Sequence, residues 1–242
     1  MMVCKMSGKK VTAVILAAGR GKRMNMPVAK QFLKLNEKPV LYYSIKAFED
    51  SDTDEIILVC GHGQVDYCRE EIVKAYGFKK VGRIVEGGAE RYDSVYKGLS
   101  AAERTDYVLI HDGARPFISV PLINEVIDTV YKSKACIVAA PVKDTIKIVD
   151  DNGWINNTPD RNLLWAAQTP QAFEYQSIKA AYEYLYKEDI SVRKSITDDA
   201  MVYAMFINEP VKIVKGDYYN IKLTTPEDLI FAKGILEVKH LT

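Results

Sequence analysis

Histidine and cysteine are scarce in this chain, and no long apolar run interrupts it. Its 242 residues include only three histidines and four cysteines, and Cys4, Cys60, Cys68 and Cys136 show neither a C-x-x-C spacing nor a neighbouring histidine cluster. This scatter argues against both a zinc site and a disulfide framework, and free thiols of this kind are typical of a reducing cytoplasm. No stretch approaches the roughly 20 apolar residues that a membrane helix needs. We therefore expect a cytoplasmic protein without membrane contact.

An excess of charge of either sign is also missing. Lys and Arg together number 33 and Asp and Glu 32, which gives a net charge of +1. No bulk electrostatic attraction to nucleic acid or to a membrane follows, so any cationic site has to be local. With 48% hydrophobic and 27% charged residues, the chain can bury a substantial core. We expect a flexible tail over residues 1–10 and a single domain over residues 11–242.

The most informative stretch is the apolar run over residues 11–18 and the loop that follows it. The run, VTAVILAA, predicts a strand buried on both faces. In the loop, Gly19 and Gly21 let backbone amides approach an anion, while Arg23 and Lys30 supply positive charge. The pattern indicates a polyphosphate site, although a surface turn with solvated cations would show the same residues.

Two common phosphate-binding loops do not fit this stretch. A P-loop would need a glycine where the chain has Leu16 and a serine or threonine where it has Arg23, and a dinucleotide-binding fingerprint would need glycine or alanine at Met24. The loop therefore belongs to neither class, and its function has to be judged from the rest of the chain.

Strand-like and helix-like segments alternate through the first 141 residues. Strands are predicted over 55–60, 80–85, 107–110 and 135–141, and helices over 39–48, 65–76, 94–102 and 122–131. This alternation predicts an α/β fold with a mostly parallel twisted sheet and helices on both faces. The polar segments 19–30, 87–91 and 111–116 each follow a strand, and ligands of such sheets bind at the carboxyl ends of the strands. We expect these three segments to meet at one edge.

From residue 142 the alternation stops. Residues 144–157 predict a β-hairpin that turns at 150–153, within an arm over about 142–162. A hairpin with little core of its own needs a partner surface, so we expect a dimerisation arm, with a flap on the same subunit as the alternative. Beyond it we expect an extended segment over 163–172, helices over 177–186 and 198–205, a strand over 211–214, and a last helix that opens at the capping box 225–228 and runs to about 238.

Several short motifs occur along the chain in a fixed order. They are LAAGxGxRM at 16–24, KQF at 30–32, GGxERxxSV at 87–95, HDGARP at 111–116, DTIK at 144–147, RxxLW at 161–165, QTPQ at 168–171, TD at 197–198, NIK at 220–222 and TPED at 225–228. In this combination the chain resembles the 2-C-methyl-D-erythritol 4-phosphate cytidylyltransferases of the non-mevalonate isoprenoid pathway. The resemblance extends from Val11 to the last helix.

The resemblance implies a Rossmann-like nucleotidyltransferase fold and the transfer of CMP from CTP to a phosphorylated polyol, with Mg2+ as cofactor and pyrophosphate as second product. Arg23 and Lys30 match the pair that neutralises the triphosphate in this family, and Lys222 matches a lysine at the α-phosphate. The remaining nucleotide-binding positions implied by the resemblance are Ala17, Ala18, Gly19 and Gly21 at the phosphates and Gly88, Ala89 and Ser94 at the cytosine. Ser94 could equally serve as a hydroxyl that starts a helix.

For the second substrate and the metal the resemblance points to another set of residues. Asp112 is the implied Mg2+ ligand, with a carboxylate paired to Arg115 as the alternative. The implied polyol-binding residues are Asp112, Ala114, Arg115, Thr169 and Thr197, with Thr145 and Arg161 contributed by the arm of the other subunit of a homodimer. His111 is expected to support the strand end rather than to act as a base. A second Mg2+ carboxylate stays open, because Tyr219 stands where some relatives have an acid.

Other functions share part of this pattern. A D-ribitol 5-phosphate cytidylyltransferase would have most of the CTP-binding motifs, but Lys147 and the segment 161–165 favour methylerythritol phosphate. A sugar-phosphate nucleotidylyltransferase for another base is disfavoured by the segment 87–94. A non-catalytic nucleotide-binding regulatory module and an NAD-binding subunit are disfavoured by the set of phosphate-binding cations and by the absence of the dinucleotide fingerprint.

Overall fold

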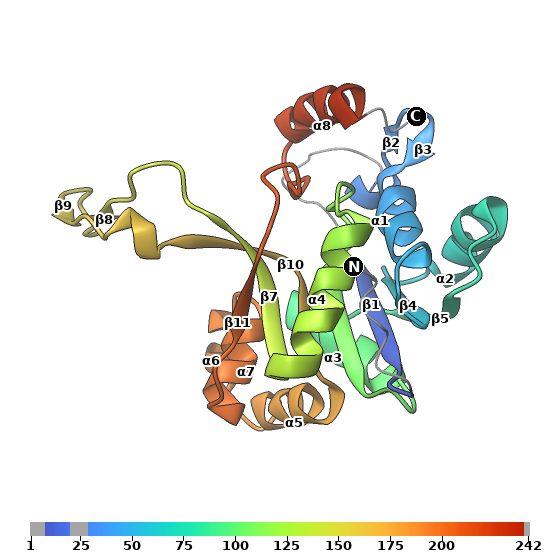
Figure 1. The fold of residues 1–242 in the computed structure, drawn as a ribbon, viewed down its shortest axis with the longest axis horizontal. Coiled ribbons are helices and arrows are strands. Elements are labelled where there is room, and N and C mark those ends of the chain that lie inside the picture. The colour runs from blue at the N-terminus through green and yellow to red at the C-terminus, as the bar shows by residue number, and fades with distance from the viewer. Residues whose placement is uncertain (1–7, 20–28, 240–242) are drawn as a thin grey trace.

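A computed structural model describes residues 8–19 and 29–239, the last of these for its backbone alone (Figure 1). The predicted loop residues Gly21 and Arg23 therefore lie outside the described residues. The ordered contacts begin earlier than expected, because Lys9 Nζ lies 3.1 Å from Asp106 Oδ1 and Lys10 Nζ lies 2.6 Å from Glu55 Oε2. These two ion pairs attach the end of the predicted tail to the domain, so the expected tail over residues 1–10 is too long.

The centre of the molecule is one seven-stranded sheet. Its strand order is β11 (Lys212–Lys215), β7 (Ala135–Pro141), β10 (Trp165–Glu174), β6 (Tyr107–Asp112), β1 (Val11–Ala17), β4 (Glu55–Cys60) and β5 (Val81–Glu86). Neighbouring strands run parallel except at β10, which is antiparallel to both β6 and β7. The prediction of a mostly parallel sheet is confirmed, but the extended segment 163–172 becomes a central strand, which its sequence did not indicate.

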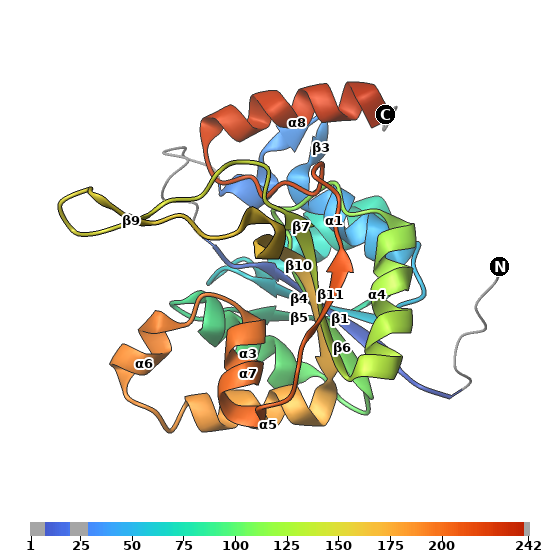
Figure 2. The same cartoon turned by 60° about the vertical axis from the view of Figure 1, so that its left-hand side comes forward.

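Helices cover both faces of the sheet, as predicted (Figure 2). One face packs against α1 (Val40–Glu49), α2 (Val65–Tyr67), η3 (Cys68–Lys74) and α4 (Val120–Ser133), and the other against α3 (Arg91–Ala101), α5 (Tyr175–Leu185) and α7 (Asp199–Ile207). Successive side chains of a strand point to opposite faces, so Ala13 and Ile15 of β1 enter the first core and Val14 the second. All three are fully buried, which explains why β1 is apolar except at Thr12.

A third, smaller core lies beside the sheet. It joins α8 (Pro226–Lys239) to the short hairpin of β2 (Lys34–Leu35) and β3 (Lys38–Pro39), which follows the 3-10 turn η2 (Lys30–Phe32). Leu223 is fully buried in this core, and its amide donates to the carbonyl of Ala114 at 2.8 Å. Asp228 Oδ2 accepts the amide of Thr225 at 2.9 Å, one half of the predicted capping box. The segment before α8 is thereby attached to the loop that follows β6.

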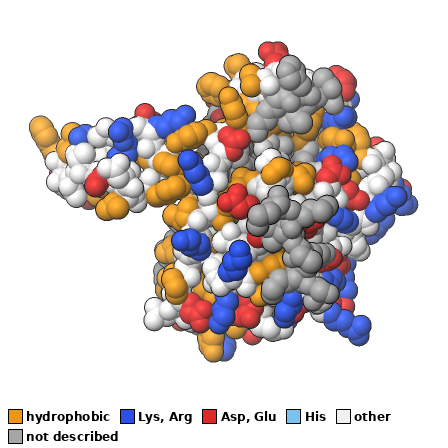
Figure 3. All heavy atoms as spheres, viewed as in Figure 1, with side chains coloured by type: hydrophobic (Ala, Val, Ile, Leu, Met, Phe, Trp, Pro, Cys, Tyr) orange, Lys and Arg blue, Asp and Glu red, His pale blue; other side chains and the backbone are white. Residues whose placement is uncertain are grey.

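The predicted hairpin projects from the body of the molecule (Figure 1). Its strands are short, β8 (Ile148–Val149) and β9 (Ile155–Asn157), and they are followed by the 3-10 turn η4 (Arg161–Leu163). Figure 3 shows hydrophobic side chains along this arm, and Trp154 and Leu163 are 75% and 79% exposed. The arm therefore presents an apolar surface that its own subunit does not cover.

Two helical regions differ from the expectation. The helix predicted over 65–76 begins as α2 and continues as the π-helical segment η3, in which the amide of Ala75 bonds to the carbonyl of Glu70. This wider turn keeps Cys68 and Ile72 buried against the sheet. The short helix α6 (Ile190–Ser195) was not predicted, because it buries none of its residues and so carries no periodic apolar pattern. None of the helices in the described part of the chain is long and apolar enough to cross a membrane.

Candidate active site

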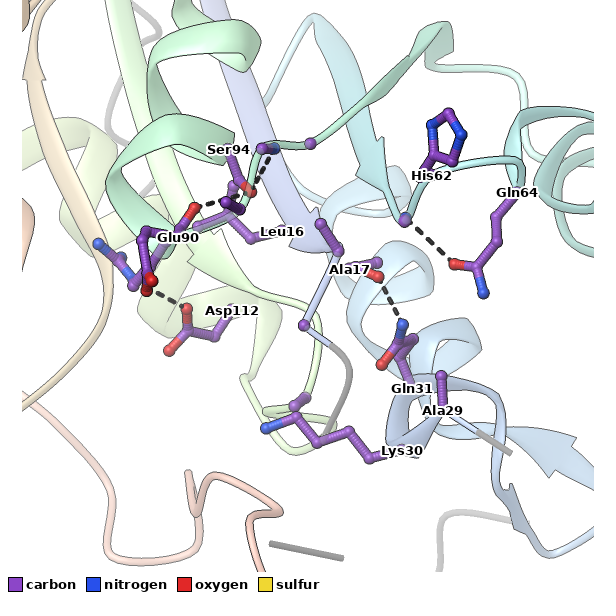
Figure 4. Close-up of a pocket in the computed structure, with 18 of the residues that line it drawn as sticks. Leu16, Ala17, Ala29, Lys30, Gln31, His62, Gln64, Glu90, Ser94 and Asp112 are labelled. Carbon is purple, nitrogen blue, oxygen red and sulfur yellow. Dashed lines mark hydrogen bonds and ion pairs between the residues drawn. The ribbon is translucent and has the colours of Figure 1, made fainter. Parts of the chain in front are cut away.

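A cavity of about 970 Å3 opens at the carboxyl edge of the sheet (Figure 4). Register explains its position, because Leu16 of β1 pairs with Asp112 of β6, Ala17 pairs with Cys60 of β4, and Cys60 pairs with Glu86 of β5. The ends of four strands are thus level with one another, and the segments that follow them line one opening. The predicted meeting of three segments is observed, and a fourth segment after β4, residues 61–64, joins them.

Most of the sequence-predicted site residues that the structure describes line this cavity. They are Ala17, Ala18, Gly19, Lys30, Gly88, Ala89, Ser94, Asp112, Ala114 and Lys222. Arg115 and Thr169 lie beneath it as partners of residues in or beside the lining, as described below. Thr145 and Arg161 are exposed on the arm, and Thr197 is exposed before α7. These last three do not line the cavity of their own subunit.

The side of the cavity next to β1 has the features of a phosphate site. Figure 4 shows Lys30 extending from η2 into the opening. The neighbouring Gln31 is buried, and its Nε2 donates to the carbonyl of Ala17 at 2.5 Å. This bond holds η2 against the end of β1, so that Lys30 and the backbone of Ala18 and Gly19 face the same space. Backbone amides beside a lysine form a typical binding surface for polyphosphate.

The opposite side is built around the start of α3. Ser94 Oγ accepts the amide of Gly88 at 3.1 Å and donates to the carbonyl of Glu90 at 3.2 Å, so it shapes the loop before the helix. A reciprocal capping box between Glu90 and Asp93 closes the same turn. The alternative of a hydroxyl that starts the helix is wrong for Ser94, because α3 begins at Arg91 with Glu90 as its N-cap, and the Ser94 side chain lines the cavity from the first turn.

The loop before α3 needs a glycine at position 87, because its backbone there comes close to Ala18 and Ser94. A side chain at Gly87 would overlap the methyl group of Ala18 and come within 2.6 Å of Ser94 Oγ. The amide of Gly87 donates to the carbonyl of Cys60 at 2.7 Å, which ties the loop to the end of β4. The loop before α3 and the loop after β1 are therefore in direct contact.

Asp112 is the central charged group of the site. Its Oδ2 lies 2.8 Å from Lys222 Nζ and 3.9 Å from Arg115 Nε, and its Oδ1 lies 3.4 Å from Arg91 Nε. Burial alone would raise the pKa of Asp112, but the positive charges of Arg91, Lys222 and Arg115 outweigh it and hold this pKa well below its usual range. Asp112 is therefore ionised, and because Arg91, Lys222 and Arg115 outnumber Asp112 and the partner of Arg91, Asp199, the group keeps a positive surplus suited to phosphates.

His111 lies behind Asp112 and is fully buried. Its Nε2 is 3.3 Å from the carbonyl of Arg115, which can only accept, so this nitrogen carries the proton. Its Nδ1 faces the hydroxyl of Thr169 at 3.1 Å, and the same hydroxyl accepts the amide of Asp112 at 3.0 Å. Burial lowers the pKa of His111 to about 4. A neutral imidazole with both nitrogens engaged supports the strand end, as the sequence predicted.

Two groups of polar residues at the site were not predicted. Arg91 forms a two-fold ion pair with Asp199 at the start of α7, with nitrogen to oxygen distances of 2.9 and 2.7 Å. In the second group, Glu86 accepts the amide of Gly63 at 2.7 Å and lies 2.8 Å from His62 Nδ1, which fixes the segment after β4. Arg91 stands inside the GGxERxxSV motif, so a signal for it existed, whereas no motif marked Glu86 and residues 61–64.

A cavity at the carboxyl ends of a mostly parallel sheet, lined by glycine-rich loops and lysines around the carboxylate of Asp112, is typical of a nucleotidyltransferase. The comparisons with known proteins identify the family. The model of the family described as 2-C-methyl-D-erythritol 4-phosphate cytidylyltransferase matches residues 11–238, and the chain belongs to this family. It is a CTP-dependent cytidylyltransferase that acts on 2-C-methyl-D-erythritol 4-phosphate in isoprenoid synthesis.

Relatives and solved structures agree with this assignment. The chain is 53% identical to a 2-C-methyl-D-erythritol 4-phosphate cytidylyltransferase of Lachnoclostridium phytofermentans, over 94% of this chain and 97% of the relative, and 50% identical to that of Lachnospira eligens, over 92% and 99%. The crystal structure of 4-diphosphocytidyl-2C-methyl-D-erythritol synthase from Anaerococcus prevotii superposes with a TM-score of 0.83 at 36% identity, over 95% of this chain and 97% of that one. The enzyme from Thermus thermophilus gives 0.73 at 29% identity, over 94% and 99%.

Proposed function

We propose that the cavity binds CTP across the edge of the sheet, with the cytosine against the segment 88–94 and the triphosphate against Ala18, Gly19 and Lys30. The observation that carries this proposal is that the two sides of the cavity differ in chemistry. One side offers backbone groups and a serine hydroxyl, which can distinguish a base, and the other offers amides and a lysine amine. Gly21 and Arg23, outside the described residues, are assigned to the triphosphate by their place in the loop.

The phosphate of the polyol enters beside Asp112, where Lys222 and Arg115 supply positive charge. One of its oxygens attacks the α-phosphorus of CTP, a new oxygen to phosphorus bond forms, and the bond to the bridging oxygen breaks as pyrophosphate leaves. The attacking oxygen is already anionic, so no residue has to remove a proton. The protein acts by positioning the two substrates and by neutralising the charge that builds up on the phosphates. Lys222 and Lys30 are the described residues best placed to do so.

Mg2+ fits this site with the phosphates as further ligands. Among the described residues no group of three or more acidic, histidine or cysteine side chains is arranged to hold a metal, and Asp112 is the carboxylate at the centre of the cavity. Mg2+ commonly takes one or two carboxylates together with phosphate oxygens and water, which matches this donor set. When bound, the ion would neutralise phosphate charge beside Asp112.

The second part of the polyol site comes from a partner subunit in our proposal. Arg161 is exposed on the arm, and its Nη1 donates to the carbonyl of Lys143 at 3.0 Å, which leaves other donors of its guanidinium for a phosphate. Trp154, Ile155 and Leu163 on the same arm are 62–79% exposed, as expected for a surface that a second copy covers. Exchange of arms in a homodimer would bring Arg161 and Thr145 to the partner's cavity, where Thr197 completes the site.

Release of pyrophosphate tests the proposed function. The purified enzyme is given CTP with 2-C-methyl-D-erythritol 4-phosphate, CTP with D-ribitol 5-phosphate, and UTP with the first polyol. We expect rapid release for the first mixture and release at least about tenfold slower for the other two, because the base and the polyol are each read by specific contacts. Faster release with ribitol phosphate would replace the polyol assignment, and equal rates with UTP would refute the assignment of the segment 88–94 to cytosine.

Three described cysteines are free and buried, in keeping with a cytoplasmic enzyme.

A further inference from the structure

Arg91 occupies an unusual place among the charged residues of the cavity. It is the first residue of α3 and lies within the segment 88–94 that we assign to cytosine. Its Nη1 and Nη2 bind the two oxygens of Asp199 at 2.9 and 2.7 Å, and its Nε lies 3.4 Å from Asp112 Oδ1. The side chain of Asp199 is fully buried, while 28% of the Arg91 side chain is exposed toward the cavity. The guanidinium of Arg91 thus links Asp112 to the buried Asp199, which serves as its anchor.

The anchor itself is rigid. Asp199 Oδ1 accepts the hydroxyl of Tyr182 at 2.6 Å, and the amides of Asp199 and Ala200 both donate to Gln171 Oε1, at 3.0 and 2.9 Å. Tyr182 is fully buried in α5, and Gln171 belongs to the central strand β10. Asp199 is therefore held in place by α5 and β10 as well as by its own helix. Through its ion pair it in turn restrains Arg91, whose side chain lines the cavity.

Three cations share the two oxygens of Asp112. Oδ1 faces Arg91, and Oδ2 faces Lys222 at 2.8 Å and Arg115 at 3.9 Å. If Lys222 turns toward a substrate phosphate, Oδ2 keeps only the longer contact with Arg115, and Arg91 is the cation that still holds Oδ1. A buried ion pair is weak evidence for stability, since apolar side chains of similar volume often stabilise as well. An ion pair that continues into the cavity therefore suggests a role in the reaction.

We propose that Arg91 is a positioning residue, which holds Asp112 in its reactive orientation and fixes the start of α3 relative to the segment 197–199. This inference rests on the proposed place of Asp112 in the polyol site. It links the two halves of the active site, because α3 begins at the nucleotide side and α7 begins beside Thr197 on the polyol side. The link passes through the folded interior, since Arg91 and Asp199 are 108 residues apart in sequence.

The test compares Arg91→Lys, Asp199→Asn and the double variant with the wild-type enzyme by pyrophosphate release from CTP and 2-C-methyl-D-erythritol 4-phosphate. Lysine keeps the charge but cannot bind Asp199 with two nitrogens and reach Asp112 with a third. Displacement of a reacting group by about 1 Å costs about 100-fold, so we expect kcat to fall 10- to 100-fold in each single variant. The KM for CTP should change less than about threefold, because the base-binding loop keeps its own bonds to Ser94.

The double variant shows whether Arg91 and Asp199 act as one unit or contribute to kcat independently. If Arg91 and Asp199 act together, kcat of the double variant stays within about threefold of kcat of the less active single variant. If they act independently, the fold-losses in kcat of the two single variants multiply. Arg83→Lys is the matched control, because Arg83 binds Glu103 with the same two-fold geometry, at 2.8 and 2.7 Å, outside the cavity lining. Its kcat should stay within about twofold of the wild type.

A purely structural role would give other results. The proposal is overturned if kcat per folded molecule of Arg91→Lys stays within threefold of the wild type, or if the losses multiply in the double variant. Where a variant does not fold, Tyr182→Phe takes its place, because it keeps every charge and removes only the hydroxyl that Asp199 accepts. We expect Tyr182→Phe to lower kcat three- to tenfold with the circular dichroism spectrum unchanged, and an unchanged kcat overturns the proposal. Inactivity of the wild type itself would instead refute the proposed function.

Discussion

Mild acid should destabilise this enzyme through His111. The folded state holds the imidazole uncharged, with a pKa lowered to about 4 by burial, while an unfolded chain has a histidine pKa of about 6.5. Between these two values the unfolded chain binds the extra proton and the folded one does not. The contribution of His111 to stability is therefore fully present above pH 6.5 and is lost as the pH falls toward 4.

The size of the effect follows from the difference in pKa. A difference of about 2.5 units corresponds to about 3 kcal/mol in total, of which about 2 kcal/mol is lost between pH 7.5 and pH 5. His111 is fully buried, so solvent screening does not reduce this figure further. For a chain of this size a urea dependence of about 3 kcal/mol per molar is expected, and the loss then lowers the urea midpoint by about 0.7 M.

Urea unfolding followed by circular dichroism at pH 7.5, 6 and 5 measures this loss. The variant His111→Gln keeps a donor for the carbonyl of Arg115 and cannot be protonated, so its midpoint should fall about 0.7 M less than that of the wild type over the same range. Thr169→Val is the control, because it removes the hydroxyl opposite Nδ1 but leaves the imidazole buried. It should lower stability by about 1 kcal/mol at each pH and keep most of the slope. If the urea midpoints of the wild type and of His111→Gln fall by the same amount between pH 7.5 and pH 5, the reasoning is refuted.

Three further substitutions test the site. Lys30→Met should lower kcat about 100-fold with an unchanged melting temperature, because a cation at the phosphates is lost; normal pyrophosphate release would remove Lys30 from the triphosphate. Ser94→Ala should raise the KM for CTP about fivefold in initial-rate measurements, because the amide of Gly88 loses its acceptor. An unaltered KM would mean that Ser94 shapes the loop before α3 without contributing to CTP binding. Arg161→Ala should raise the KM for the polyol phosphate about tenfold and spare CTP affinity by calorimetry; unchanged kinetics would exclude the arm from the site.

Much of the fold was predictable because its strands are uniform. The residues of β7 are apolar from end to end and those of β4 are apolar after Glu55, since strands covered on both faces have no solvent side, and their bounds agree with the prediction over 55–60 and 135–141. The hairpin was predictable for another reason, because residues 150–153 are strong turn formers between two short extended runs. In both cases local residues alone determine the element.

The parts that were missed depend on partners far away in sequence. The pair of Arg91 and Asp199 is one example, and the contact of Gln171 with the start of α7 is another, since each joins residues that no local pattern connects. The short helix α6 was missed because it has no buried face. For the site, the sequence indicated ten of the residues that line the cavity, but residues 61–64 and the way in which three cations share Asp112 became evident only from the folded structure.

The antiparallel direction of β10 brings both ends of the arm to the edge of the sheet at which the cavity opens. β7 ends at Pro141 at the carboxyl edge, the arm follows, and β10 returns from Trp165 at the same edge, where Trp165 pairs with Pro141. A parallel strand in this place would have to begin at the opposite edge, and the arm would lie away from the cavity. Because β10 instead runs back beside β6, the hydroxyl of Thr169 accepts the amide of Asp112, and the arm leaves the domain at the same edge as the cavity. The reversal of a single central strand therefore places the start of the arm, Thr169 and the loops that line the cavity at the same edge of the sheet.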